Sequence, residues 1–188
     1  MLFPEKPITL KDGRSALLRS PVEEDAAEML AFLKDCANET HFLSREIEEY
    51  TETEAEEAER LARTNASETG SMLICAVGNE IAGNCQLSFN RLSRIRHRAT
   101  IAIALRKKYW GLGIGTAMFK QMFLLAQARG VTQLELGFME GNARARALYE
   151  KMGFRIVSYH PNAFRLKDGT LCHEYFMVRE LGTGADNN

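Results

Sequence analysis

The chain has 188 residues, of which 45% are hydrophobic and 26% charged, and its formal net charge is −1. This length and composition are typical of one folded domain and exclude a largely disordered chain. The near-zero charge argues against nucleic acid as a partner, and neither a membrane-spanning run nor a signal peptide is recognisable, which predicts a cytoplasmic protein with no membrane partner.

The first half of the chain is predicted to form strands around two helices. The turn Lys11–Arg14, with the sequence Lys-Asp-Gly-Arg, precedes a strand over residues 15–19, because Asp-Gly between extended segments favours a hairpin. A helix follows, with Ser20 as its cap and proline at the next position. The glutamate-rich segment 46–63 predicts a second helix. Strands are then predicted over residues 72–77, 81–89 and 98–105.

The second half is predicted to alternate helices and strands. One helix begins at Gly113 and ends near Arg129, where Gly130 suits a C-terminal cap. The remaining elements are a strand over residues 132–138, a helix over 142–152 and a final hairpin of strands over 154–166 and 170–180. Interleaved helices and strands predict an α/β fold, a mixed sheet with helices packed on its faces. We expect one domain over residues 1–181 and a disordered tail over 182–188.

Three glycines, Gly111, Gly113 and Gly115, stand between the predicted strand 98–105 and the helix after it. The first amides of a helix have no partner within it and carry a partial positive charge, and glycine lets a phosphate approach the backbone. The pattern therefore predicts an anion site, although a strand-to-helix turn without a ligand has the same composition. It is not a dinucleotide fingerprint, because position 116 is Thr, and no Gly-Lys-Ser/Thr of a P-loop is present.

The loop Tyr109–Gly115, YWGLGIG, resembles the pyrophosphate-binding loop of the GNAT family of N-acetyltransferases. A second segment, Asn142–Phe154 (NARARALYEKMGF), is similar to the family signature Asn-x-x-Ala-x-x-Leu-Tyr-x-x-x-Gly-Phe. Two separated motifs are far more specific than either alone. The resemblance covers residues 72–178 and leans toward the branch of ribosomal-protein and polyamine acetyltransferases. It implies a mostly antiparallel sheet that splays between the strand before the loop and the strand after it.

The resemblance implies that acetyl-CoA binds across these two motifs. In the family, the pantetheine arm pairs with the backbone of the strand before the loop, and the loop holds the pyrophosphate. The implied cofactor-binding residues are Ile103, Ala104 and Leu105 on the strand, Trp110, Gly111, Leu112, Gly113, Ile114, Gly115 and Thr116 in the loop, and Asn142, Ala145, Tyr149 and Lys151 on the last helix. Trp110 stands where Arg or Gln is usual, so we expect the contacts to shift to backbone amides. Asn142 also suits an N-cap.

Two catalytic residues are proposed from the sequence. The resemblance places Tyr149 near the coenzyme sulfur, where its phenol acts as general acid, although a half-buried structural tyrosine is the other interpretation. The glutamate that some family members carry on the strand before the loop is missing from residues 98–103. Glu140, at the end of the next strand, is the candidate general base, and His97 and His173 are weaker alternatives. The cysteines are widely spaced, so no metal site is predicted. The thioester is already activated and needs no covalent enzyme intermediate, so no cysteine is assigned as a nucleophile.

The predicted function is transfer of an acetyl group from acetyl-CoA to a primary amine by direct attack in a ternary complex. The acceptor is a small amine, a polyamine or a peptide N-terminus. The alternatives are a non-catalytic module that binds or senses acyl-CoA, and a nucleotide-binding protein. The glutamates of segment 46–59 would suit a cationic acceptor, but a solvated helix face has the same pattern. The family also suggests a homodimer.

Overall fold

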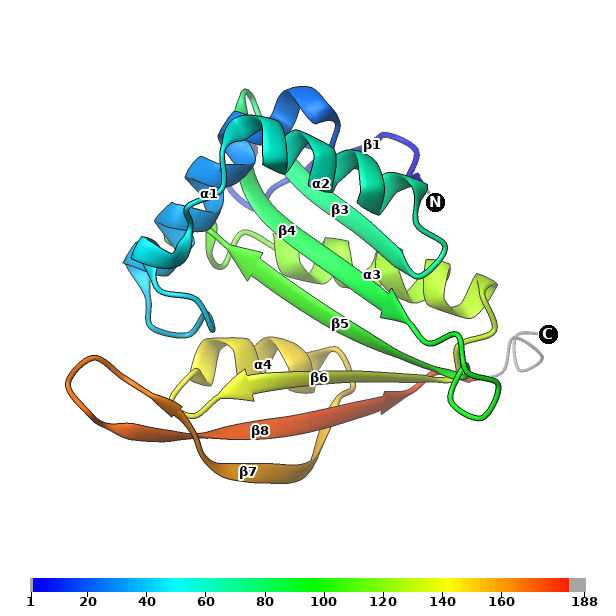
Figure 1. The fold of residues 1–188 in the computed structure, drawn as a ribbon. Helices are drawn as coiled ribbons and strands as arrows, with labels where there is room; N and C mark the ends of the chain where they lie inside the picture. The colour runs from blue at the N-terminus through cyan, green and yellow to red at the C-terminus, as the bar shows by residue number, and fades with distance from the viewer. Residues whose placement is uncertain (1, 183–188) are drawn as a thin grey trace.

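The computed structural model describes residues 2–182, which form one eight-stranded sheet with helices on both faces (Figure 1). The sheet order is β1-β2-β3-β4-β5-β6-β8-β7, and neighbouring strands are antiparallel except β5 and β6. The strands are β1 (Lys6–Thr9), β2 (Ser15–Arg19), β3 (Gly70–Val77), β4 (Glu80–Phe89), β5 (Arg98–Leu105), β6 (Gln133–Met139), β7 (Arg155–Arg165) and β8 (Leu171–Glu180). This architecture confirms the predicted α/β fold. Apart from Gly182, the predicted tail lies outside the described residues.

The helices form two layers because strand side chains alternate between the two faces of the sheet. On β3, Met72 and Ile74 pack in a cluster with α1 and α2, whereas Leu73 and Cys75 pack in the cluster that contains α3 and α4. The helices are α1 (Ala26–Glu39), α2 (Glu54–Ala66), α3 (Ile114–Ala128) and α4 (Ala143–Lys151), with 3₁₀ turns η1 (Glu23–Asp25), η2 (Ile47–Glu49) and η3 (Lys107–Tyr109). None of these helices of residues 2–182 is long and apolar enough to cross a membrane.

The sheet divides between β5 and β6. These parallel strands pair only where Arg98–Thr100 faces Gln133–Glu135. Beyond Thr100, β5 continues along β4 and β6 continues along β8, so the facing edges of β5 and β6 have no strand partner within the described chain. Figure 1 shows the two strands diverging toward the side where α1 ends and α4 begins. The sheet therefore splays at the place that the resemblance implied.

The predicted helix over residues 46–63 is wrong in its first half. Ile47–Glu49 form only η2, and α2 begins at Glu54 because Thr53 caps it. The Thr53 hydroxyl accepts a hydrogen bond from the Glu56 N–H at 3.3 Å, and the Glu56 carboxylate accepts one from the Thr53 N–H at 2.8 Å. This reciprocal pair is a capping box, which starts a helix inside the glutamate run.

The N-terminal region also differs from the prediction. The strand β1, for which no range was predicted, pairs with β2 across the predicted turn and confirms the hairpin there. Ser20 does not cap a helix, because its hydroxyl accepts a hydrogen bond from the Phe3 N–H at 2.8 Å. Asp25 instead accepts from the Val22 N–H at 2.7 Å, at the start of η1, and pairs with Arg19. The sequence signal for a cap was present, but another residue fills the role.

Gly83 on β4 allows β5 and α3 to approach the sheet closely. A methyl group at this position would lie 2.3 Å from Leu105 Cδ2 and 3.3 Å from Met118 Sδ. We expect Gly83→Ala to lower the free energy of unfolding by about 1–3 kcal/mol, the usual cost of overpacking a core, in urea denaturation. Ser88→Ala, at an exposed position of the same strand, is the matched control and should change it by less than about 0.5 kcal/mol. Equal stability of the two variants would contradict the close packing.

Candidate functional site

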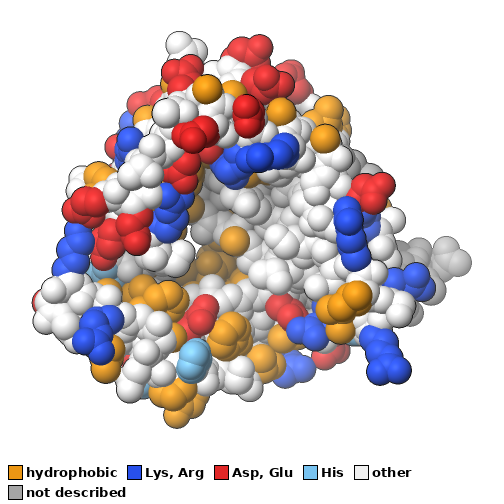
Figure 2. Space-filling view, viewed as in Figure 1, with side chains coloured by type: hydrophobic (Ala, Val, Ile, Leu, Met, Phe, Trp, Pro, Cys, Tyr) orange, Lys and Arg blue, Asp and Glu red, His pale blue; other side chains and the backbone are white. Residues whose placement is uncertain are grey.

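A cavity of about 920 Å³ opens where β5 and β6 diverge. Its walls are the end of α1 with the loop after it, the end of β5, the loop between β5 and α3, the start of α4 and parts of β6 and β8. Figure 2 shows the hollow on this face of the molecule, with hydrophobic side chains inside it. Every predicted cofactor-binding residue lines this cavity except Leu112. The carbonyl of Leu112 accepts from the Lys11 N–H at 3.2 Å, and its side chain packs against the core.

The glycine loop presents backbone amides to the cavity. Gly111 and Gly113 have φ angles of 80° and 94°, in the left-handed region that favours glycine. Gly113 is the N-cap of α3, and the first amide that bonds back within the helix is that of Ala117, to the Gly113 carbonyl at 3.1 Å. The amides of residues 114–116 therefore remain available at the positive end of the helix, as an anion site requires.

Gly115 has a packing role. A methyl group there would lie 2.8 Å from Leu148 Cδ2, so the start of α3 rests directly against α4. The two motifs recognised in the sequence are thus in contact with each other through this glycine. Their close approach brings the amides of α3 and the side chains of α4 to one wall of the cavity.

Lys11 is a cavity residue that sequence reasoning missed. It belongs to the turn between β1 and β2, and its Cγ would lie 3.9 Å from a methyl group on Gly113. The lysine therefore adds a cation beside the glycine loop, where it can meet a phosphate. Only the turn itself is visible in the sequence, and the position of that turn beside the loop depends on the hydrogen bond from the Lys11 N–H to Leu112.

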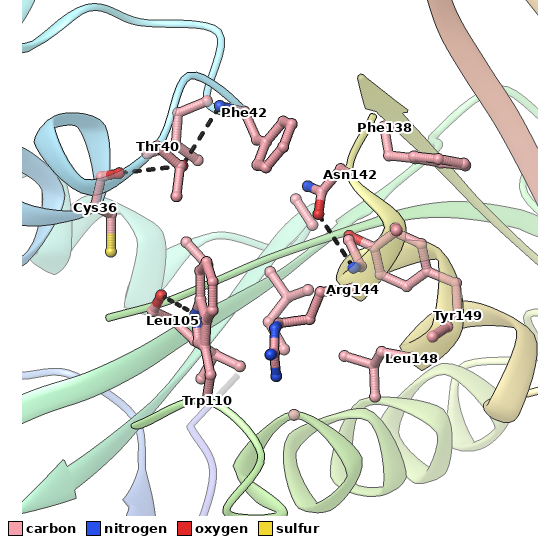
Figure 3. Close-up of a pocket in the computed structure, with 18 of the residues that line it drawn as sticks. Cys36, Thr40, Phe42, Leu105, Trp110, Phe138, Asn142, Arg144, Leu148 and Tyr149 are labelled. Carbon is pink, nitrogen blue, oxygen red and sulfur yellow. Dashed lines mark hydrogen bonds between the residues drawn. The ribbon is translucent and has the colours of Figure 1, made fainter. Parts of the chain in front are cut away.

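Trp110 lies against the end of β5 and does not offer its indole N–H to a ligand. Its Nε1 donates to the Leu105 carbonyl at 2.9 Å, and the Arg144 guanidinium lies over its ring, 5.0 Å from the centroid (Figure 3). Arg144 thus lines the cavity. This geometry fits the expectation that backbone amides replace the side-chain donor that is usual at this position of the loop.

The free edge of β5 presents further backbone groups. The Arg106 N–H bonds to the Ala82 carbonyl at 3.1 Å on the β4 side. Because bonding directions alternate along an antiparallel strand, Ala104 also faces β4, whereas Ile103 and Leu105 face the gap. The Leu105 carbonyl is taken by Trp110, so the Ile103 N–H and carbonyl and the Leu105 N–H remain for an extended ligand with amide groups.

The start of α4 contributes Asn142, Ala145 and Lys151. The Asn142 side chain is the N-cap, because its Oδ1 accepts the Ala145 N–H at 3.1 Å. It also lines the cavity, so the structural role does not exclude contact with a ligand. The Lys151 ammonium lies 3.5 Å from the Thr116 hydroxyl. Lys151 therefore stands at the same end of the cavity as the α3 amides.

Tyr149 is 6% exposed and is enclosed by aromatic rings. Its ring centroid lies 5.9 Å from those of Phe119 and Phe138 and 6.3 Å from that of Phe154. Its hydroxyl points into the cavity (Figure 3) and has no hydrogen-bond partner among residues 2–182. Burial raises the pKa of the phenol above its ordinary value, because the phenolate would be poorly solvated. A neutral phenol in this position is a proton donor.

Glu140 does not line the cavity, contrary to what a general base requires. Its carboxylate accepts the His173 N–H at 3.1 Å and holds the end of β6 against β8. His97 and His173 do not line the cavity either. The carboxylates that do are Glu39 and Glu174, which sequence reasoning missed because α1 and β8 carry no motif. The end of α1 and its loop add Cys36, Thr40, Phe42, Leu43 and Ser44.

The glutamates of segment 46–59 lie outside the cavity lining, and several of them have partners elsewhere. Lys167 from the β7–β8 connection lies 2.9 Å from Glu48 and 3.4 Å from Glu46. Glu52 pairs with Arg45 at 2.8 Å. The buried Glu57 pairs with Arg60 at 2.6 Å, and Glu49 and Glu56 belong to capping boxes. These contacts favour a structural role for the segment over an acceptor site.

Comparison with known proteins gives one family. The sequence model of the acetyltransferase (GNAT) family matches residues 30–154. A mycothiol acetyltransferase from Beutenbergia cavernae is 49% identical over 51 residues, which cover 27% of this chain and only 17% of that relative's length.

Solved structures extend the likeness to the fold. An acetyltransferase of the GNAT family from Streptococcus pneumoniae is 28% identical, with a TM-score of 0.81, covering 89% of this chain and 99% of that one. A ribosomal-protein-alanine N-acetyltransferase from Brucella melitensis is 22% identical, with a TM-score of 0.75 and coverage of 87% and 99%. At that identity, the second likeness speaks for the fold alone.

Proposed function

Because this chain belongs to the GNAT family of acetyltransferases, we propose that it transfers the acetyl group of acetyl-CoA to a primary amine while both substrates occupy the cavity. The observation that carries the proposal is that three features line the same cavity. These features are the free amides at the start of α3, the unpaired edge of β5 and the buried hydroxyl of Tyr149.

The residues present fit acetyl-CoA. Its pyrophosphate suits the amides of residues 114–116, with Lys11 and Lys151 close by as cations. Its pantetheine arm contains amide groups, which suit the free Ile103 and Leu105 positions of β5 in the way that another strand would. Acetyl-CoA supplies an activated thioester, so the protein need not form a covalent intermediate.

The protein's own groups then position the amine, stabilise the developing negative charge and protonate the leaving sulfur. The cavity holds the amine close to the thioester carbonyl, which removes the entropy cost of a bimolecular encounter. The Leu105 N–H, free on the edge of β5, donates to the carbonyl oxygen on which negative charge develops. The attacking nitrogen loses its proton to water, and the Tyr149 hydroxyl donates a proton to the departing sulfur and is reprotonated from water.

The acceptor class is a small amine, a polyamine or a peptide N-terminus. The match to the mycothiol acetyltransferase covers too little of that protein to carry its substrate over. The ribosomal-protein branch is supported by the Tyr-Trp-Gly motif of the loop and by no closer evidence. A homodimer and a cytoplasmic location remain predictions.

The test is an amine panel assayed for release of free coenzyme thiol, with the acetylated product identified by mass spectrometry. We expect thiol release that depends on both acetyl-CoA and an amine. Acetyl-CoA binding by calorimetry with no turnover on any amine would favour the non-catalytic module. A larger rise in melting temperature with ATP or NAD than with acetyl-CoA would favour a nucleotide-binding protein.

A further inference from the structure

The cavity is lined by both cations and carboxylates. The cations that line it are Lys11, Arg144 and Lys151, and each lies at the glycine loop or at the adjoining end of α3. The carboxylates that line it are Glu39 and Glu174. Glu174 neighbours Tyr175, which packs with Phe138 on the α4 face, so Glu174 points to the opposite face, where α1 ends. Glu174 is therefore on a different wall from the cations beside the glycine loop, whereas Glu39 is bonded to the Lys107 N–H just before that loop.

The carboxylate of Glu174 lies over β6 at Gly137, which has no side chain. A methyl group on Gly137 would lie 2.5 Å from Glu174 Oε1, so only glycine at this position leaves room for the carboxylate. Gly137 is exposed and lies on β6 beyond the last pair with β5, where the two strands diverge. The carboxylate thus reaches from β8 toward the space between the strands.

Of the two carboxylates that line the cavity, Glu174 is the one with no hydrogen bond or ion pair within the described chain. Glu39 accepts the Lys107 N–H at 2.6 Å, and the nearby Glu140 accepts the His173 N–H. No hydrogen bond or ion pair with any residue of the described chain satisfies Glu174, although Met139 and His160 stand opposite it on the flanking strands. A half-buried carboxylate without a protein partner is a ready acceptor for a cationic group.

We propose that Glu174 binds the ammonium group of the acceptor, and that the site selects primary amines with no carboxylate beside the amine. This assignment rests on the proposed function. The end of α1 and its loop add the uncharged Cys36, Thr40 and Phe42 to the same lining. The lysines and the arginine of the lining lie instead beside the glycine loop and the start of α3. A carboxylate carried next to the amine would be desolvated beside Glu174 without a cation, which disfavours free amino acids.

The first experiment measures kcat/KM for matched acceptor pairs that differ in the carboxylate. Suitable pairs are 2-phenylethylamine with phenylalanine and methionine amide with methionine. We expect the carboxylate-free member to be preferred by at least about tenfold, because one unpaired buried charge costs more than one ordinary hydrogen bond. Equal use of amino acids and amines would overturn the assignment.

The second experiment compares Glu174→Gln with the wild type. The KM for 2-phenylethylamine should rise about tenfold to one-hundredfold, the effect of losing one charge-assisted hydrogen bond, and the KM for acetyl-CoA should stay the same. Glu174→Asp should restore part of the affinity, and Gly137→Ala, which displaces the carboxylate without removing it, should also raise the amine KM. Glu180→Gln, on the exposed end of the same strand, is the matched control.

The outcomes distinguish a failure of the Glu174 assignment from a failure of the proposed function. An unchanged amine KM in Glu174→Gln, with active wild-type protein, would reject Glu174 and leave the proposed function intact. No transfer by the wild type to any amine, with acetyl-CoA bound, would reject the proposed function and this assignment together. A rise in both KM values would show that Glu174 supports the cavity as a whole and would also reject the assignment.

Discussion

Gly113→Asp is expected to abolish acetyl-CoA binding. Gly113 has a φ angle of 94° and caps α3, and its neighbours supply the free amides of the loop. An aspartate carboxylate would accept those amides itself and repel the pyrophosphate. Losing two hydrogen bonds to a charged group, at about 1.5–3 kcal/mol each, lowers affinity by more than about one hundredfold. Isothermal titration calorimetry with acetyl-CoA measures the effect directly.

Gly113→Asn separates the charge from the backbone strain. Asparagine has nearly the shape of aspartate, carries no charge and is among the residues that best tolerate the left-handed region. We expect it to retain measurable affinity, with melting temperature close to that of Gly113→Asp. Loss of binding in both variants to the same extent would assign the effect to backbone distortion. Full binding by Gly113→Asp would show that the phosphates bind elsewhere.

Tyr149→Phe is expected to lower kcat by about one hundredfold or more, the usual contribution of a general acid, with little change in acetyl-CoA affinity. The phenylalanine ring keeps the contacts with Phe119, Phe138 and Phe154, so the variant should fold. Only the hydroxyl that points into the cavity is removed. Steady-state kinetics and calorimetry on the same preparation give the two quantities. An unchanged kcat would return Tyr149 to the interpretation of a structural tyrosine.

The pH dependence gives an independent readout of Tyr149. Burial raises the pKa of its phenol above the ordinary value of about 10, so the acid form persists through neutral and mildly alkaline pH. The wild-type rate should therefore rise between about pH 7 and pH 9 as the amine loses its proton, with no falling limb below about pH 10. A falling limb near neutral pH would contradict the assigned donor.

The same raised pKa has a consequence for stability. Above about pH 10 the unfolded chain releases the Tyr149 proton while the folded chain retains it, so the unfolded state is favoured as pH rises. Tyr149→Phe should remove this contribution, and chemical denaturation at alkaline pH measures the difference. At neutral pH both states carry the proton, so no stability is lost there; the loss begins as pH rises through the pKa of about 10 that the phenol has in the unfolded chain.

The coenzyme side of the cavity was largely predictable from the sequence because its chemistry is local. The free amides at the start of α3 and the φ angle of 94° at Gly113 follow from neighbouring residues of the loop. The Asn142 cap likewise follows from residues within the first turn of α4. Trp110 shows the limit of such reasoning. Its place in the motif was visible, but its bond to the Leu105 carbonyl and its stacking with Arg144 depend on how β5 ends against the loop.

The lining of the proposed acceptor side depends on the tertiary structure alone. Glu140 directly follows β6, yet the pairing of β6 with β8 turns its carboxylate to His173. The same pairing sets Glu174 over Gly137, and a slip of one residue in this register would point Glu174 to the other face.

The sequence by itself therefore predicted most of the elements, the anion site and the family resemblance, because helix caps, glycine conformations and apolar periodicity are properties of neighbouring residues. Only the tertiary structure decided which side chains line the side of the cavity that we propose for the acceptor. Strand register and the splay of β5 from β6 bring the ends of α1, β5 and β8 together, and those segments share no local signal that a sequence pattern can carry.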